Sequence, residues 1–255
     1  MNINQAFEIL KSAGDGRAAR IITDKYKKIS FLRTIYYAHL LRRGMPVAKI
    51  IKSKWFYELE FYTNKNTLDP RPDTETLVSA VINDCIETKP RRILDMGTGT
   101  GCIICALCKN IDGLSGVAID KSKPALRVAN KNIKRLKLKD KIKTKCADFA
   151  TFKSADKFDI IVSNPPYIPY GDTRVNTGAK FDPQIALYAK NNGLSAYEEI
   201  AKNALSLINE HGKIYMEIGV GQSNLVIKIF QFFGWNFERV EKDLNGINRV
   251  LVFSI

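Results

Sequence analysis

The residues best suited to chemistry form the run Asn164-Pro165-Pro166-Tyr167, which follows an apolar stretch. Two adjacent prolines remove two N–H donors and restrict φ, so the run cannot extend a sheet and its carbonyls point in fixed directions. The Asn164 side-chain carbonyl and the Pro165 backbone carbonyl can accept both N–H groups of a planar nitrogen, and Tyr167 can pack against it. Two such acceptors help to localise a delocalised lone pair for attack on carbon. The run therefore indicates a site for a conjugated nitrogen nucleophile.

A glycine-rich run can cradle an anionic ligand, and it comprises Asp95, Gly97, Thr98, Gly99, Thr100 and Gly101. Glycines allow positive φ and close approach of a ligand to the backbone, and amides at the start of the next helix attract an anion. A dinucleotide loop needs a further glycine where this chain has Cys102, and Asp95 would repel a pyrophosphate. An ammonium suits Asp95 and a carboxylate suits the loop amides. The run therefore favours S-adenosylmethionine as methyl donor, with S-adenosylhomocysteine as product.

Three side chains at later strand ends are candidates for holding the adenosyl group. Asp120 can accept hydrogen bonds from a ribose diol, although a nicotinamide enzyme would use the same device. Asp148 can accept from the adenine amino group, and Phe149 can stack on the ring or lie at its edge. An aspartate at this place also often serves only as a helix or turn cap. We expect all three to contact the adenosyl group and Asn164 to border the donor as well.

Strand and helix patterns alternate from residue 77 onward. Strand signals occur at 92–95, 116–120, 142–146, 158–162 and 213–218, a helical pattern at 222–233, and a closing antiparallel pair at 235–241 and 248–254. This alternation predicts an α/β fold with a doubly wound sheet, in which ligands bind beyond the carboxyl ends of the strands. The candidate residues above all lie at those ends.

The chain before residue 77 has a different character. Apolar residues recur at helical spacing between residues 4 and 41, broken at Gly14 to Gly16, and Gly44 to Pro46 ends the pattern. Residues 55–68 alternate aromatic and polar types around Asn64 to Asn66, as a β-hairpin turning there would. We predict an N-terminal helical domain at 1–50, a β-hairpin linker at 51–76 and a methyltransferase domain at 77–255.

Further segments extend the pattern well beyond the site residues: Pro70 to Glu75, Phe181 to Pro183 with Ala186-Leu187, Gly193-Leu194 with Tyr197, Met216 to Gly219 with Gln222, and Asp243 to Gly246 with Arg249-Val250. Together with the Asn-Pro-Pro-Tyr run, they resemble the protein-glutamine N5-methyltransferases that modify peptide chain release factors, the PrmC/HemK-type family. The resemblance covers the chain from about Gly44 to its end.

The resemblance implies a class I S-adenosylmethionine-dependent methyltransferase, with a Rossmann-like seven-stranded sheet, a small N-terminal helical domain that docks the substrate, and a linking hairpin. It implies methylation of the side-chain amide N5 of the Gln in the Gly-Gly-Gln motif of class I release factors, which modulates translation termination. The donor would lie on Gly97 to Gly101, Asp120 and Phe149, and the glutamine amide on Asn164 to Tyr167. The helical domain is shorter than is usual for the family, and Asp69 replaces an apolar residue before Pro-Arg-Pro.

Basic side chains gather in two zones, residues 1–50 and residues 131–145, each with a net charge of +7 within a chain of +14. Such zones suit an acidic partner or nucleic acid, and they are also typical of lysine-rich solvated faces. A nucleic-acid amino-methyltransferase acting on adenine N6 or on cytosine is therefore an alternative, with these zones as its strand-binding face. A non-catalytic binding module is a further alternative, but it would be expected to have lost Asn164 or the loop glycines.

Composition narrows the remaining classes. No apolar run approaches the length that spans a bilayer, and residues 1–10 lack the features of a secretory signal. We therefore expect a cytoplasmic protein, and we expect it to be a monomer. A mitochondrial transit peptide is the alternative for the basic first fifty residues. Cys102, Cys105 and Cys108 have a spacing that an iron–sulfur cluster could use. Without a fourth nearby cysteine, helix packing is the favoured interpretation. No metal is expected.

Overall fold

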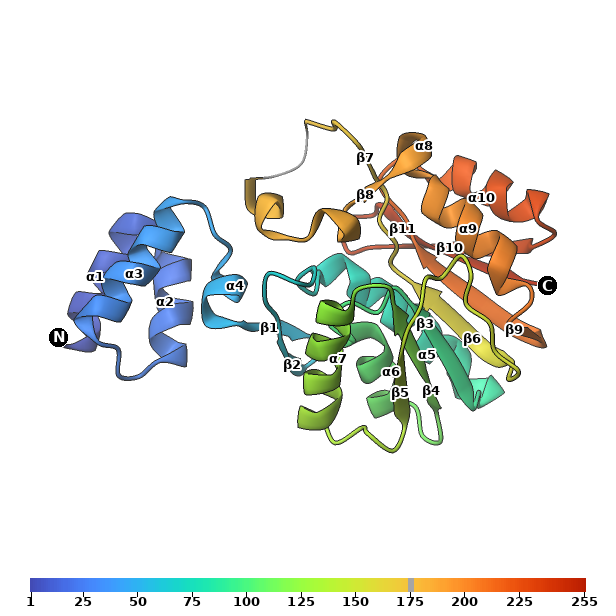
Figure 1. Ribbon diagram of the computed structural model, residues 1–255, viewed down its shortest axis with the longest axis horizontal. Helices are drawn as coiled ribbons and strands as arrows, with labels where there is room; N and C mark the ends of the chain where they lie inside the picture. Colours follow the sequence, from blue (N-terminus) through green and yellow to red (C-terminus); the bar gives the residue numbers. More distant parts are fainter. Residues whose placement is uncertain (174–176) are drawn as a thin grey trace.

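A seven-stranded sheet organises the larger part of the computed structural model, which describes residues 1–173 and 177–255 (Figure 1). Its order is β10-β11-β9-β6-β3-β4-β5. The strands are β3 (Arg92–Met96), β4 (Ser115–Asp120), β5 (Ile142–Cys146), β6 (Phe158–Ser163), β9 (Ile208–Glu217), β10 (Asn236–Lys242) and β11 (Asn248–Ser254). Strands β3, β4, β5, β6 and β9 are parallel, and β11 and β10 continue the sheet antiparallel beside β9. The predicted α/β fold is confirmed.

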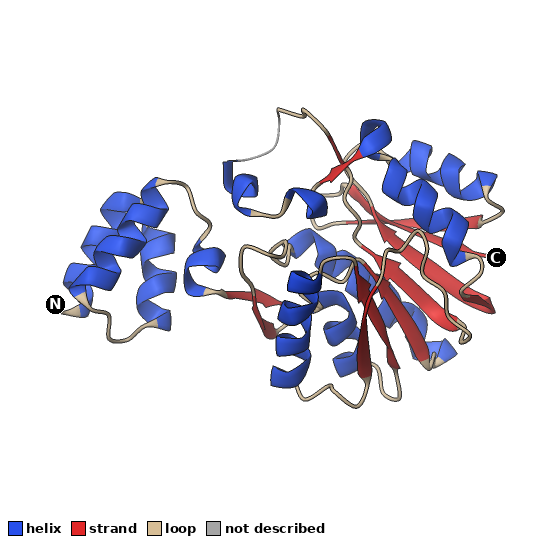
Figure 2. Ribbon diagram, in the orientation of Figure 1, coloured by secondary structure: helices blue, strands red, loops and turns tan. Residues whose placement is uncertain are grey.

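Helices cover the sheet on both faces (Figure 2). One apolar cluster, which includes Ile93, packs with α5 (Glu75–Thr88), α6 (Cys102–Asn110) and α7 (Lys123–Arg135). The other, which includes Leu94, packs with α9 (Ser195–Ala204) and α10 (Ser223–Phe232). Because Ile93 and Leu94 are successive residues of β3, their side chains point to opposite faces. A parallel strand covered on both faces is apolar over its buried length, as residues 160–162 of β6 are.

The core contains the cysteines that the sequence predicted to pack within a helix. Cys102, Cys105 and Cys108 are buried free thiols along α6, which confirms the packing interpretation. In the described part of the chain, no group of His, Cys, Asp and Glu is arranged to hold a metal ion, and no helix is both long and apolar enough to cross a membrane. The strand predicted at 213–218 begins earlier, at Ile208. The sequence did not indicate its first half because those residues are largely polar and pair irregularly with β6.

Four helices form the N-terminal module: α1 (Ile3–Ala13), α2 (Gly16–Lys25), α3 (Phe31–Arg42) and α4 (Val47–Ile51). The first three begin where the side chains of Asn2, Asp15 and Ser30 accept backbone N–H groups, which satisfies donors that a helix start leaves free. The helices predicted between residues 4 and 41 are confirmed, and α4 adds a turn that the sequence did not indicate. The module forms the end of the molecule that carries the N-terminus, and α4 leads from it to the hairpin (Figure 1). The domain boundaries remain a prediction.

The hairpin is present, but its turn lies elsewhere than predicted. Strands β1 (Ser53–Phe56) and β2 (Leu59–Tyr62) are joined at Tyr57 and Glu58, which both have positive φ, at 46° and 60°. Neither residue type signals such a turn, so the Asn-Lys-Asn tripeptide drew the prediction instead. Asn64 and Asn66 form a separate turn after β2, in which the Asn64 side chain accepts the Asn66 N–H at 2.9 Å.

Short elements complete the rim at the carboxyl ends of the strands. They are the 3₁₀ turns η1 (Pro72–Thr74), η2 (Thr177–Phe181) and η3 (Gln184–Ala186), the strand pair β7 (Ile168–Pro169) and β8 (Tyr188–Ala189), and α8 (Lys190–Gly193). They bring segments from three parts of the chain over the same edge of the sheet (Figure 1). This edge is where the candidate residues lie.

Candidate active site

The glycine-rich loop joins β3 to α6 and is held from below by the neighbouring strand. The N–H groups of Gly97 and Thr98 both donate to the Ile119 carbonyl of β4, each at 2.9 Å. Gly97 and Gly99 have φ of 80° and 55°, and a Cβ added to either would meet no atom within 4 Å. The loop therefore presents bare backbone to open space, as close approach of a ligand requires.

Asp95 lies beneath this loop. Its carboxyl group is fully buried; Oδ2 accepts the Thr98 hydroxyl at 2.6 Å, whereas Oδ1 has no hydrogen-bond partner among the described residues. Burial raises the pKa of Asp95 from 3.8 to about 7, while the Thr98 hydrogen bond acts in the opposite direction. The side chain does not line the cavity above, so direct pairing with a donor ammonium stays a prediction. The orphaned oxygen is what such a cation would satisfy.

Asp120 ends β4 and faces the cavity. Its Oδ2 accepts the Gly99 N–H at 3.0 Å and its Oδ1 accepts the Ser122 N–H at 2.8 Å. Burial raises the pKa of Asp120, and the two backbone hydrogen bonds oppose that rise. Each carboxylate oxygen can accept more than one hydrogen bond, so both remain able to accept from a ribose hydroxyl.

Of the two predicted adenine contacts, one lines the cavity and the other does not. Phe149 is buried and lines the cavity. The Asp148 side chain instead accepts the Ala150 N–H at 3.0 Å, two residues along the chain, and lies 3.9 Å from Lys121 Nζ. This is the turn-capping arrangement that the sequence offered as the alternative, and Asp148 is outside the cavity lining. Its contact with adenine stays a prediction.

These residues surround one cavity, which is open to solvent. The predicted residues that line it are Gly97, Thr98, Gly99, Thr100, Asp120, Phe149, Asn164 and Pro166. The opposite wall, which the sequence did not indicate, comes from the chain before α5 and from the segment at η3, and includes Leu68, Pro70, Pro183, Ile185 and Ala186.

The Asn-Pro-Pro-Tyr run continues from β6 at the wall between this cavity and a second one. Asn164, Leu68, Arg71 and Ala186 line both, while Pro165 and Tyr167 line only the second. The Asn164 amide Nδ2 donates to the Thr74 hydroxyl at 3.1 Å, which leaves the Asn164 side-chain oxygen available as an acceptor. Gln222 Nε2 donates to the Tyr167 carbonyl at 3.0 Å and so holds the end of the run.

Two polar residues beside Asn164, Thr74 in the lining of the first cavity and Glu217 in that of the second, were not among the predicted site residues. Thr74, which ends η1, contacts Asn164, and Glu217, which ends β9, lines the second cavity and is 1% exposed. Both belong to segments that carry the family resemblance, and that was the only signal for them in the sequence. They reach Asn164 through the fold, since they lie 90 residues before and 53 residues after it.

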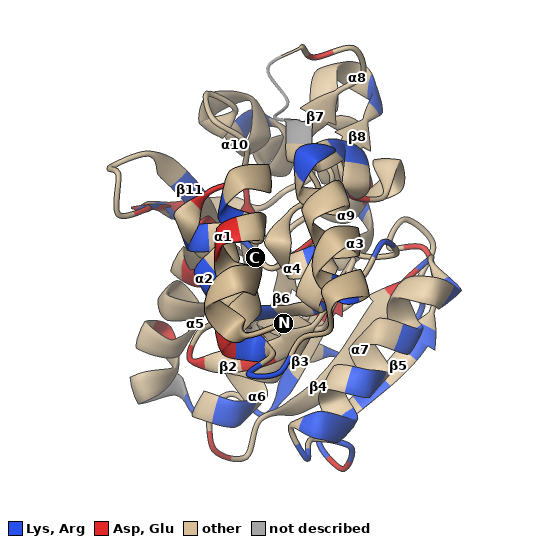
Figure 3. Cartoon of the chain, turned by 90° about the vertical axis from the view of Figure 1, so that its left-hand side faces the viewer, with Lys and Arg blue, Asp and Glu red and all other residues tan. Residues whose placement is uncertain are grey.

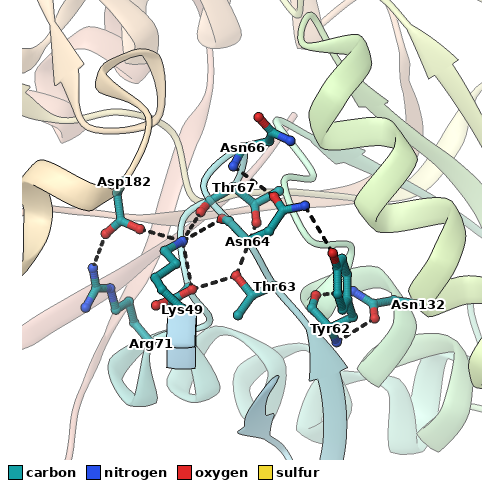
Figure 4. Close-up of polar contacts among 10 residues, drawn as sticks. Lys49, Tyr62, Thr63, Asn64, Asn66, Thr67, Arg71, Asn132 and Asp182 are labelled. Carbon is teal, nitrogen blue, oxygen red and sulfur yellow. Dashed lines mark hydrogen bonds and ion pairs between the residues drawn. The ribbon is translucent and has the colours of Figure 1, made fainter. Parts of the chain in front are cut away.

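A buried ion-pair network supports the first cavity, the one that the glycine loop borders, from outside (Figure 4). Lys49 of α4 ion-pairs with Asp69 and with Asp182, each at 2.8 Å, and donates to the carbonyls of Asn64 and Thr67. Arg71 contacts the other oxygen of Asp182 at 2.8 Å. The network ties the N-terminal module, the segment after β2 and the segment that supplies Pro183 into one wall. Nothing around Lys49 in the sequence distinguishes it from a solvated lysine.

Comparison with known proteins identifies the family of the chain. Residues 71–194 match the model of the methyltransferase small domain family. The chain is 37% identical over 230 residues to a bifunctional methyltransferase of Rickettsia typhi, covering 82% of this chain but only 44% of that protein. It is 34% identical to the release factor glutamine methyltransferase of Caulobacter vibrioides, covering 96% of this chain and 86% of that one.

Among solved structures, the hMettl16 catalytic domain in complex with a MAT2A 3′UTR hairpin has a TM-score of 0.61 at 17% identity and covers 88% of this chain and 80% of that one. At that identity the likeness concerns the fold, which is that of class I S-adenosylmethionine-dependent methyltransferases. The relatives named as release factor enzymes are similar along most of their own length. The chain belongs to the release factor glutamine methyltransferase family.

Proposed function

We propose that this protein transfers a methyl group from S-adenosylmethionine to the side-chain amide nitrogen of the glutamine in the Gly-Gly-Gln motif of a class I peptide chain release factor. The observation that carries the proposal is the position of Asn164, which borders both the glycine-loop cavity and the second cavity. A side chain placed there can hold an acceptor nitrogen while a methyl group approaches from the other side. The names of the relatives supply the substrate, and the site supplies the reaction type.

The site fits the donor at three points. The open backbone of the glycine loop suits the carboxylate of the methionine moiety. The orphaned oxygen of Asp95 suits its ammonium, and the free lone pairs of Asp120 suit the ribose diol. Bound there, the donor supplies a sulfonium-activated methyl group. The chain's own residues supply orientation and shelter from water.

At the acceptor, the Asn164 side-chain oxygen and the Pro165 carbonyl accept the two amide N–H groups, and Tyr167 packs against the amide plane. A bond forms between the amide nitrogen and the methyl carbon while the carbon–sulfur bond breaks, and the sulfonium becomes a neutral thioether. The nitrogen then releases one proton to solvent, to which both cavities open. Because the nitrogen becomes strongly acidic as it gains the methyl group, the step needs no strong base. Geometry and hydrogen bonding are the protein's contribution.

The basic surface suits a docking role for an acidic partner. Most Lys and Arg side chains of residues 131–145, which span the end of α7 and edge strand β5, are exposed. Figure 3 marks the Lys and Arg positions of these two elements in blue. Such a field accelerates encounter with an acidic protein and weakens with salt. The same surface also favours the second candidate, an adenine or cytosine amino-methyltransferase. We assign the release factor because of the relatives, and a cytoplasmic, monomeric enzyme is part of the same proposal.

The test is to supply labelled donor with three acceptors: release factor, release factor with Glu in place of the motif Gln, and unmethylated DNA. Label should enter only the first, and Asn164→Ala should abolish it. Label in DNA alone would overturn the proposal in favour of the second candidate. Label in both release factors would mean that another residue is the acceptor.

A further inference from the structure

The register of the sheet sets a buried carboxyl group beside Asn164. In the parallel pair of β6 and β9, Ser163 is opposite Met216, so Asn164 and Glu217 are the next residues at the same edge. Glu217 is 1% exposed, and its Oε2 has no hydrogen-bond partner among the described residues. It lines the second cavity with Asn164 and Tyr167. A buried carboxyl group in this position needs a physical reason.

Thr74 connects the two side chains. Its hydroxyl accepts from Asn164 Nδ2 at 3.1 Å, and a hydroxyl that accepts there keeps its own hydrogen for another partner. The carboxyl group of Glu217 lies beside both the Thr74 hydroxyl and the Asn164 amide. The three side chains therefore form a chain of hydrogen-bonding groups, drawn from η1, β9 and the end of β6.

The direction of this chain depends on Glu217. A carboxylate can only accept a hydrogen bond, so the Thr74 hydroxyl donates its hydrogen to Glu217. The lone pairs of the Thr74 oxygen then face Asn164, and Asn164 must present its NH₂ group to them. The Asn164 oxygen then faces the acceptor nitrogen. A protonated Glu217 can donate instead, which lets the chain reverse and the Asn164 amide turn over. The NH₂ group would then face the acceptor and repel its N–H groups.

We propose that Glu217 is a positioning residue: acting through Thr74, its carboxylate holds the side-chain amide of Asn164 with the oxygen toward the acceptor nitrogen. Glu217 touches neither donor nor acceptor in this role. The inference rests on the proposed function only for its kinetic consequence, since the orientation of Asn164 is a property of the protein alone.

The surroundings of Glu217 determine when it is charged. Burial raises the pKa of Glu217 to about 7, against the opposing effects of the Thr74 hydroxyl, Arg249 and Asn164, while Asp73 adds to the rise. The other titratable groups near it are the buried Tyr167 and Tyr197 and the thiol of Cys102, which stay neutral because burial raises the pKa of each. The orientation of Asn164 should therefore switch near neutral pH.

The first test needs no acceptor. With ¹⁵N-asparagine labelling, the Asn164 side-chain NH₂ signals are identified by their loss in Asn164→Ala and followed from pH 5.5 to 8.5. They should shift with a midpoint near 7 in the wild type and stay fixed in Glu217→Gln. Glu210→Gln, an exposed change on the same strand, and Asp95→Asn, which removes the other carboxyl group with a pKa of about 7, should keep the shift. An unchanged titration in Glu217→Gln would overturn the proposal.

The second test is kinetic. At saturating donor, wild-type kcat should rise about tenfold from pH 6 to pH 8, as the ionised fraction of a group with a pKa near 7 does. Glu217→Gln should flatten this profile with little change in donor affinity. Thr74→Val should lower kcat and also flatten the profile, and Thr74→Ser, which keeps the hydroxyl, should restore both. A release factor that is never methylated would contradict the proposed function alone, because the NMR result stands without it. A Thr74→Val enzyme with the wild-type profile would contradict the positioning role.

Discussion

Without donor, the free energy of unfolding of Asp95→Asn should increase relative to that of wild type as pH rises. The same substitution should weaken binding of the donor. The substitution keeps the shape of the side chain and an oxygen for the Thr98 hydroxyl, but removes the charge from a fully buried group. It also places an N–H group where Oδ1 has no partner, a cost that does not vary with pH. The change of stability with pH therefore isolates the buried charge.

The magnitude follows from the pKa. Burial raises the pKa of Asp95 from 3.8 to about 7, and at about 1.4 kcal/mol for each pKa unit the charged form costs roughly 4 kcal/mol of folding free energy. The folded state holds the proton more tightly than the unfolded state, so this cost is absent below pH 3.8, grows between 3.8 and 7, and is complete above 7. Between pH 5.5 and pH 8, wild type should lose about 2 kcal/mol relative to Asp95→Asn.

The assay is urea unfolding of both proteins without donor at pH 5.5 and pH 8, together with calorimetric binding of two ligands. S-Adenosylhomocysteine carries the ammonium and should bind Asp95→Asn roughly tenfold to a hundredfold more weakly, because a hydrogen bond to a charged group is lost. Methylthioadenosine lacks the amino acid and should bind both proteins alike. Equal pH dependence of stability would refute the argument from buried charge. Equal weakening of both ligands would refute the ammonium assignment.

Four further substitutions separate the roles of donor site, acceptor site and scaffold. Asn164→Ala should nearly abolish methyl transfer while calorimetry finds donor affinity within a few-fold of wild type. Asp120→Ala should chiefly weaken donor binding, so that the Kd for donor rises. Lys49→Met leaves the buried Asp69 carboxylate without a cation and Asp182 with Arg71 alone, and urea unfolding should show a loss of about 3–5 kcal/mol. Gly193→Ala forces a Cβ to 2.2 Å from the Tyr167 carbonyl at a φ of 86°, so kcat should fall more than donor affinity, and a wild-type kcat would contradict that coupling.

The fold was predictable because its signals are local. An apolar run such as 160–162 is buried on both faces of the sheet, and that burial selects the same residue types at each of its positions. The hairpin turn was mislocated because Tyr57 and Glu58 adopt positive φ without any of the residue types that usually signal it. There the surrounding packing, with Tyr57 N–H bound to Glu75, outweighs the local preference.

The site was predictable where the rule of strand ends applies. The glycine loop, Asp120, Phe149 and Asn164 each follow a parallel strand, so their meeting at one edge follows from the topology alone. Asp148 obeys the same rule but turns to cap its own loop, because an aspartate can bind a backbone N–H two residues away. Thr74 and Lys49 lie outside the rule. They reach the site through long-range contacts, for which a local sequence pattern carries no signal.

The buried carboxyl groups show how stability and function divide in this fold. Asp182 is 6% exposed and faces two cations, Lys49 and Arg71, so its charge serves to hold the wall of the donor cavity together. Asp95 and Glu217 are more deeply buried, neither has a cation within ion-pair distance among the described residues, and burial raises the pKa of each to about 7. A scaffold gains nothing from two such groups, since neutral side chains of the same shape would fold more readily. We predict that function supplies the compensation: Asp95, beneath the glycine loop, would receive the cation of the donor, and Glu217, beside Asn164, would set the direction of the hydrogen bonds that orient the amide.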